Sequence, residues 1–251
     1  MTGLSARKSS ASDTVLAPGD GELHLWFCRR ETSSESESFQ REVLARYAGV
    51  APGELSFTRG PNGKPALLSP HLPIAFNLSN CRDRLVLAVS AGCAVGVDLE
   101  YCDRQRDVEK LARRFFSAAE LRQLDACTGL GQIYGFYDYW TLKEAAIKAG
   151  GGSLGRDLDK TSFDLTEPAC HEREGLPGRI AVLTSAIDGQ AWFGLLQAFD
   201  DYRLAICCVG TQDFSTGIRY FNWPPKNSEA CSIKLLAASG AVKNIAELAS
   251  L

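Results

Sequence analysis

The chain has 251 residues, of which 45% are hydrophobic and 23% are charged, and its formal net charge is −3 at pH 7. This composition is typical of a globular domain, and the acidic balance argues against a general nucleic-acid-binding protein. No apolar run approaches the roughly 20 residues that a membrane-spanning helix requires, so we expect no membrane association.

The first half of the predicted fold is residues 22–94. Residues 1–21 contain no apolar segment of the kind found in secretory signals, so we expect a disordered tail and a cytoplasmic protein. Alternation and aromatic content predict a strand over residues 22–28. Further along, the patterns predict a helix over 39–49 and strands over 55–58, 74–78 and 84–89.

The second half is predicted over residues 95–212. It opens with a short apolar segment at 95–99 and an arginine-rich helix over 107–116. The sequence S-A-A-E at 117–120 is a capping box that opens another helix. An aromatic stretch then leads into a helix ending at the glycine run 150–152, and strands are expected at 161–165, 179–183, 191–199 and 203–209. Residues 213–251 are expected to form an appendage that is turn-rich at first and has helical periodicity from 231.

The order of elements repeats along the chain. A helix at 41–50 is followed by strand-like segments, and a second helix at 143–152 is followed by a similar series with longer loops. In this alignment Arg46 and Lys148 occupy equivalent positions. The repeat predicts an α+β fold of two pseudo-symmetric α/β halves, with the active site at their interface, where ligands commonly bind.

Two carboxylates follow the apolar run of the second half, in the sequence GVDLE at 96–100. Asp98 and Glu100 are two residues apart, so in a strand they point to the same face. Neighbouring carboxylates repel unless a cation or a proton lies between them. The nine scattered cysteines contain no C-x-x-C and there are three histidines, so oxygen ligands and Mg²⁺ are favoured over zinc. The alternative is a strand end with two solvated acids.

A third carboxylate lies in the helix WTLKEAAIKAG at 140–150. Glu144 and Lys148 are four residues apart and share one face, while Lys143 lies about 100° around the helix, toward the flank of that face. A surface ion pair would give the same pattern. The aromatic residues around Trp140 favour a buried helix entry, and charges in such surroundings need partners.

The motifs GVDLE at 96–100, RFFSAAE at 114–120 and WTLKEAAIK at 140–148, together with GKP at 63–65 and FNLSN at 76–80, resemble those of the 4′-phosphopantetheinyl transferases of the surfactin-synthetase-activating (Sfp) type. Asp98 lies 42 residues before Trp140, which matches the spacing in that family. The resemblance extends over about residues 22–210.

The resemblance implies Mg²⁺-dependent transfer of the phosphopantetheine arm of coenzyme A (CoA) to a serine of an apo acyl or peptidyl carrier protein by a monomer, with release of adenosine 3′,5′-bisphosphate. It implies that the metal ligands are Asp98, Glu100 and Glu144, with Asp98 also near the CoA pyrophosphate, and that the general base is Glu120 or Glu144. It also implies that Lys143 and Lys148 stabilise phosphate charge. The remaining residues that it implies for CoA binding are Arg46, Lys64, Ser79 and Asn80.

Two departures from the family pattern concern CoA binding. Asn80 stands where many relatives have a histidine, so this contact loses its charge. The segment between Cys28 and Phe39 is shorter than the basic segment of relatives, which implies weaker binding of the CoA 3′-phosphate.

Carrier proteins are acidic around their serine, so the cations of the helix over 107–116 are candidates for docking, namely Lys110, Arg113 and Arg114. A solvated amphipathic helix is the alternative for these residues. Two alternatives to the transferase also remain: a relative that binds CoA or carrier protein without turnover, and a Mg²⁺-dependent hydrolase of the CoA pyrophosphate.

Overall fold

The computed structural model describes residues 15–19, 21–32, 34–165, 177–210, 217–223, 233–242 and 244–247. Most of the predicted tail lies outside these ranges. The helices are α1 (Glu35–Ala48), η1 (Pro52–Glu54), α2 (Val108–Phe115), α3 (Ala118–Asp125), α4 (Leu130–Gly150) and α5 (Leu154–Asp157). The strands are β1 (Glu22–Arg29), β2 (Ser56–Arg59), β3 (Pro65–Ser69), β4 (Ile74–Cys81), β5 (Arg84–Ala91), β6 (Ala94–Tyr101), β7 (Ser162–Leu165), β8 (Gly178–Thr184), β9 (Ala191–Gln197), β10 (Tyr202–Val209), β11 (Gly217–Trp223), β12 (Lys234–Ala238) and β13 (Ile245–Glu247).

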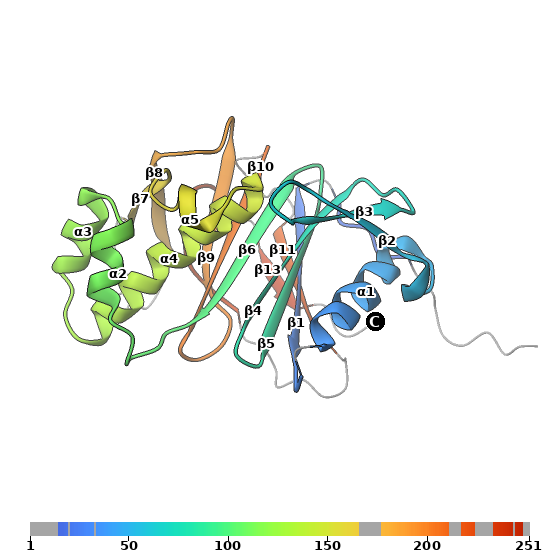
Figure 1. Cartoon of the computed structure of the whole chain (residues 1–251), viewed down its shortest axis with the longest axis horizontal. Helices are drawn as coiled ribbons and strands as arrows, with labels where there is room; N and C mark the ends of the chain where they lie inside the picture. The colour runs from blue at the N-terminus through green and yellow to red at the C-terminus, as the bar shows by residue number, and fades with distance from the viewer. Residues whose placement is uncertain are drawn as a thin grey trace, which may run out of the picture.

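The strands form two large sheets and one hairpin. The first sheet has the order β13-β11-β1-β5-β4, the second has the order β6-β10-β9-β12-β8-β7, and β2 pairs with β3. The predicted α+β class is confirmed. Figure 1 shows α2, α3 and α4 on one side of the strands and α1 with the β2–β3 hairpin on the other.

Alternating side chains of the strands divide the apolar interior into layers. Leu23 and Leu25 of β1 belong to one apolar cluster with Val97 of β6, so the two sheets face each other across this cluster. Trp26, on the opposite face of β1, packs with α1. Cys207 of β10 packs with α4 on the outer face of the second sheet. Each sheet therefore has one helix-covered face and one face against the other sheet, as two similar halves require.

Strands β4 and β6 meet where the two halves join. Three side chains of β4, two residues apart, accept hydrogen bonds from backbone N–H groups of β6: Asn77 from Val97 at 2.8 Å, Ser79 from Leu99 at 3.2 Å and Cys81 from Tyr101 at 3.2 Å. These side chains satisfy β6 on the side where no strand of the described residues pairs with it. The junction brings a polar face of β4 next to β6.

Helix α4 crosses β6 at very close range. A methyl group on Gly96 would collide with the backbone of α4, at 2.9 Å from the Cα atom of Ala149 and closer still to the carbonyl oxygen of Ala145. A glycine is therefore required at the start of the GVDLE segment. Fourteen residues of α4 are buried, because α2 and α3 cover the side that faces away from the sheet.

The prediction for the C-terminal segment needs correction. The helical periodicity expected from residue 231 onward is wrong for the described residues, which form β12 and β13. The turn-rich segment before it contains β11, which runs parallel to β1, and β12 pairs with β9. Strand pairing outweighs the helical propensity of Ala and Leu here. The segment thus belongs to both sheets, although we expected an appendage.

Every helix in the described part of the chain is too short or too polar to span a bilayer.

Candidate active site

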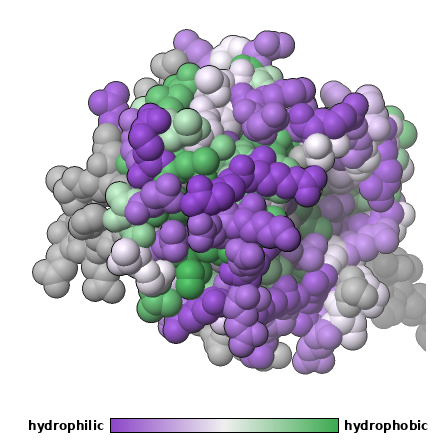
Figure 2. All heavy atoms as spheres, turned by 60° about the vertical axis from the view of Figure 1, so that its left-hand side comes forward, coloured by the Kyte–Doolittle hydropathy of each residue, from purple (hydrophilic) through white to green (hydrophobic). Residues whose placement is uncertain are grey.

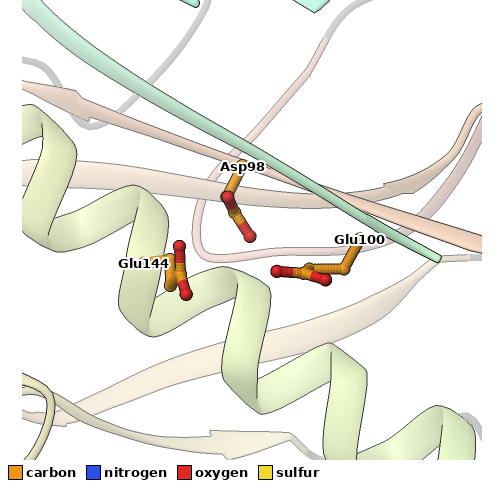
Figure 3. Close-up of side chains that lie close together, drawn as sticks. All are labelled: Asp98, Glu100 and Glu144. Atoms are coloured by element: carbon orange, nitrogen blue, oxygen red, sulfur yellow. The ribbon is translucent and has the colours of Figure 1, made fainter. Parts of the chain in front are cut away.

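Three carboxylates converge at the junction of the halves, and we call them the acidic cluster: Asp98 and Glu100 of β6 and Glu144 of α4. One oxygen of each lies within 4.8 Å of the others. Figure 3 shows the two strand residues pointing toward the helix, and Glu144 pointing back at them. The predicted alternation of β6 and the helical position of Glu144 produce this convergence.

The cluster carries more negative charge than its surroundings balance. Burial, followed by the charge of Asp98, raises the pKa of Glu100 to about 7. The same two causes, in the same order, raise the pKa of Glu144 to about 8. Burial and the repulsion between the carboxylates thus both disfavour their ionised forms, and a bound proton or cation would relieve both effects.

Lys148 is the nearest cation to the cluster. Its Nζ atom donates hydrogen bonds to Asp98 Oδ1 at 2.6 Å and to Ser79 Oγ at 3.1 Å, and lies 3.9 Å from Glu144 Oε2. Burial lowers the pKa of Lys148, but the carboxylates of Asp98 and Glu144 outweigh this effect and the net pKa is raised. Lys148 therefore stays charged and neutralises part of the cluster.

The donor set of the cluster fits a hard divalent cation. All three side chains offer carboxylate oxygens, which Mg²⁺ prefers. Asp98 Oδ2 is buried and has no hydrogen-bond partner among the residues that the structure describes. A buried carboxylate oxygen without a partner is costly, and a metal ion would satisfy it.

A cavity of about 470 Å³ opens beside Lys148 and is lined by residues of both halves, including Lys64, Asn77 and Ser153. A second cavity of about 920 Å³ lies between the end of β1 and the start of α1 and contains none of the predicted site residues. The first cavity is the one that adjoins the acidic cluster's cation.

A family model and several similar proteins all indicate one family for this chain. A family model described as the 4′-phosphopantetheinyl transferase superfamily matches residues 94–207. The chain is 32% identical over 163 residues to the 4′-phosphopantetheinyl transferase HetI of Nostoc sp. (strain PCC 7120), covering 61% of this chain and 68% of the relative. It is 30% identical over 179 residues to the 4′-phosphopantetheinyl transferase of Bacillus subtilis, covering 71% and 73%. The chain belongs to the 4′-phosphopantetheinyl transferase superfamily.

A further relative, the 4′-phosphopantetheinyl transferase AcpT of Escherichia coli (strain K12), is 38% identical over 145 residues, covering 58% of this chain and 70% of the relative. The matched region of the family model begins with β6 and ends within β10, so it includes the acidic cluster and α4. The predicted resemblance to this superfamily is confirmed.

Within this transferase fold, Glu120 and Lys143 lie apart from the acidic cluster and pair with each other. Lys143 Nζ is 3.0 Å from Glu120 Oε2, and both side chains are inaccessible to solvent. Lys143 also donates to the carbonyl oxygens of Thr161 at 2.6 Å and Leu158 at 3.2 Å. Burial lowers the pKa of Lys143, and the charge of Glu120 opposes this.

Besides Lys143, the carboxylate of Glu120 has two further hydrogen-bond partners. Its carboxylate accepts from the backbone N–H of Ser117 at 2.7 Å, which completes the predicted capping box, and from that of Phe163 at 3.0 Å. The structure thus brings Glu120 and Lys143 into a buried ion pair apart from the acidic cluster, and their roles as base and phosphate contact stay predictions. Both face the core on the side of α4 away from the cluster.

The predicted CoA-binding residues of the first half are dispersed. Ser79 faces the cluster, whereas Asn80 is exposed, because successive strand residues point to opposite faces. The guanidinium of Arg46 lies 4.6 Å from the ring centre of Trp223, a cation–π contact that ties α1 to β11. The ammonium of Lys64 contacts backbone carbonyl groups of the second half.

The predicted docking cations occupy the exposed face of α2. Lys110, Arg113 and Arg114 are all exposed, while Val108 and Ala112 face the core. Arg113 pairs with Glu109 at 2.7 Å, so part of its charge is balanced within the helix. Figure 2 turns the α2–α3 side of the molecule forward and shows a largely hydrophilic surface with hydrophobic patches between. The docking role remains a prediction.

Two residues near the site were not singled out from the sequence. Asn77 fixes the backbone of β6 next to Asp98, and its alternation with Ser79 in FNLSN was the available signal. Arg106 lies with its guanidinium 5.3 Å from the ring centre of Trp140, and its charge acts on Glu100. The sequence placed Arg106 only among the cations of the arginine-rich segment around α2, without a role at the cluster.

Proposed function

We propose that the chain transfers the 4′-phosphopantetheine moiety of CoA to a serine hydroxyl of an apo acyl or peptidyl carrier protein in a Mg²⁺-dependent reaction. The observation that carries this proposal is the acidic cluster with Lys148 at the junction of the halves, within the segment that matches the superfamily model.

In this reaction the serine oxygen forms a bond to the phosphorus next to the pantetheine arm. The bond from that phosphorus to the bridging oxygen breaks, and adenosine 3′,5′-bisphosphate leaves with the bridging oxygen. The serine proton passes to a carboxylate, and we assign this base to Glu144, since Glu120 is enclosed with Lys143.

Asp98, Glu100 and Glu144 would hold Mg²⁺, which would neutralise charge on the pyrophosphate oxygens. Lys148 adds a second positive charge beside the same oxygens, where negative charge develops as the phosphorus is attacked. Ser79 positions the ammonium of Lys148 through its hydroxyl oxygen, at 3.1 Å.

The test is mass spectrometry of an apo carrier protein after incubation with the chain, CoA and Mg²⁺. We expect a mass gain of about 340 Da, the phosphopantetheine group, which EDTA abolishes and added Mg²⁺ restores. Asp98→Asn and Glu144→Gln keep the size of each side chain and should lower the rate at least about 100-fold. Glu37→Gln, on the exposed face of α1, is the matched control and should retain the wild-type rate.

Three results would overturn the proposal. CoA binding without any mass gain across several carrier proteins would indicate a binding relative. CoA cleavage without modification of the carrier would indicate a hydrolase. Wild-type rates in both carboxamide variants would remove the metal assignment.

A further inference from the structure

Lys64 reaches from the first half of the molecule to the backbone of the second. It lies in the hairpin between β2 and β3, directly before Pro65, and the turn is closed by a hydrogen bond from Gly60 N to Lys64 O at 2.9 Å. Proline restricts the residue that precedes it to extended conformations. The backbone of Lys64, from which the side chain starts, is therefore held in one conformation at the place where the hairpin meets α4.

The ammonium of Lys64 is fully used by backbone acceptors. Nζ donates to the carbonyl oxygens of Lys148 at 2.6 Å, Val95 at 2.9 Å and Ala149 at 3.2 Å. A lysine ammonium has three N–H donors and no acceptor, so none remains for a phosphate. This placement differs from the phosphate contact that the family resemblance implies.

The three acceptors belong to the two elements that form the active site. Lys148 and Ala149 lie in the last turn of α4, whose carbonyl groups lack partners within the helix and attract cations. Val95 lies in β6, three residues before Asp98. Lys64 therefore joins α4 to β6 at the residue whose own ammonium contacts Asp98 at 2.6 Å.

A second contact of the same hairpin also attaches it to the end of α4. Asn62 Nδ2 donates to the carbonyl oxygen of Gly151 at 2.7 Å. Gly151 is the left-handed residue that ends α4, with φ of 66°. The hairpin of the first half thus caps the end of the helix that carries Glu144 and Lys148.

We propose that Lys64 is a positioning residue: it holds the last turn of α4 against β6 and so sets the distances between Lys148, Glu144 and Asp98, while its ammonium makes no contact with the phosphates of CoA. This inference rests on the proposed function. It distinguishes Lys64 from residues that bind the substrate, because its loss should change turnover and metal affinity more than CoA affinity.

The experiment compares Lys64→Met with Arg59→Met. Both variants remove a cation of the same hairpin, but the hydrogen bond of Arg59 to Gly63 O, at 3.1 Å, stays within the hairpin. For Lys64→Met we expect kcat to fall about 10- to 100-fold, since small displacements of catalytic groups have effects of this size. KM for CoA, and the preference for CoA over 3′-dephospho-CoA, should stay within about twofold of wild type. Arg59→Met should leave all three quantities unchanged.

A binding measurement tests the inference independently of turnover. Calorimetric titration with Mg²⁺ alone should show about tenfold weaker binding for Lys64→Met and no change for Arg59→Met, because displaced ligands lower metal affinity. A wild-type chain that binds Mg²⁺ and CoA but transfers nothing would overturn the proposed function, while these affinities would still decide the role of Lys64.

Two outcomes would overturn the positioning role. A tenfold rise in KM for CoA with lost preference over 3′-dephospho-CoA would make Lys64 a phosphate ligand. A lower melting temperature with unchanged kcat and Mg²⁺ affinity would make its role only structural. If Lys64→Met fails to fold, Asn62→Ala, which removes one exposed contact, should lower kcat about two- to fivefold in the same pattern, and an unchanged kcat would contradict the inference.

Discussion

At the residue scale, adjacent members of one motif have opposite surroundings. Lys143 is enclosed with Glu120, while Glu144 faces the acidic cluster. Lys143→Met leaves the Glu120 carboxylate buried without its cation, so we expect a loss of about 3–5 kcal/mol in the free energy of unfolding, measured by urea denaturation. The double variant Lys143→Met, Glu120→Gln removes both charges and should be more stable than the single variant.

A loss below about 1 kcal/mol in Lys143→Met, the size typical of exposed ion pairs, would contradict this interpretation.

The sequence predicted that Asp98, Glu100, Glu144 and Lys148 belong together, and the structure brings them together. It could not show that Lys143 and Glu120 meet on the far side of α4, because that depends on where α3 and β7 pack. A family motif identifies conserved types of residue, whereas the side of the helix that becomes core is decided by tertiary contacts.

At the element scale, the close crossing of α4 over β6 determines whether the acidic cluster forms. Gly96→Ala places a methyl group against the backbone of α4, which cannot move aside as a side chain can. We expect a loss of about 1–3 kcal/mol in stability and a lower transfer rate, because the helix and strand must separate. Gly53→Ala is the matched control, since its methyl group would meet nothing within 4 Å.

Unchanged stability and rate in Gly96→Ala would show that the crossing tolerates expansion. Most elements were predictable: alternation and aromatic content located β1, strands were expected at the positions of β5 and β10, and S-A-A-E located the start of α3. The strands β12 and β13 were not, because Ala and Leu favour helix locally and only the neighbouring strands make an extended conformation better. The β4–β6 junction also depends on contacts between residues distant in sequence.

At the scale of the whole molecule, the C-terminal segment holds the first half together. Phe221 of β11 stacks on the ring of Trp26 in β1, with centres 4.1 Å apart, and is buried. We expect Phe221→Ala to cost about 3–5 kcal/mol in the free energy of unfolding, since it leaves a cavity between the strand and α1. Asn222→Ala, whose side chain makes one exposed hydrogen bond to Glu247 at 3.0 Å, should change stability by less than about 0.5 kcal/mol.

Equal stability of the Phe221 and Asn222 variants would show that β11 contributes little to the core.

The two-half architecture followed from the repeated order of helix and strands. The contribution of one late segment to both sheets did not, because no repeat or motif marks it in the sequence.

The pairing of residue 22 with residue 217 also affects how the protein is made. During synthesis β1 leaves the ribosome early, but the strand that covers one of its edges follows only after the entire second half. Until then the nascent first half exposes an unpaired strand edge and the face of Trp26, both of which favour association with other chains. Folding of the first half should therefore finish after synthesis of the second, and nascent chains should bind chaperones for most of translation.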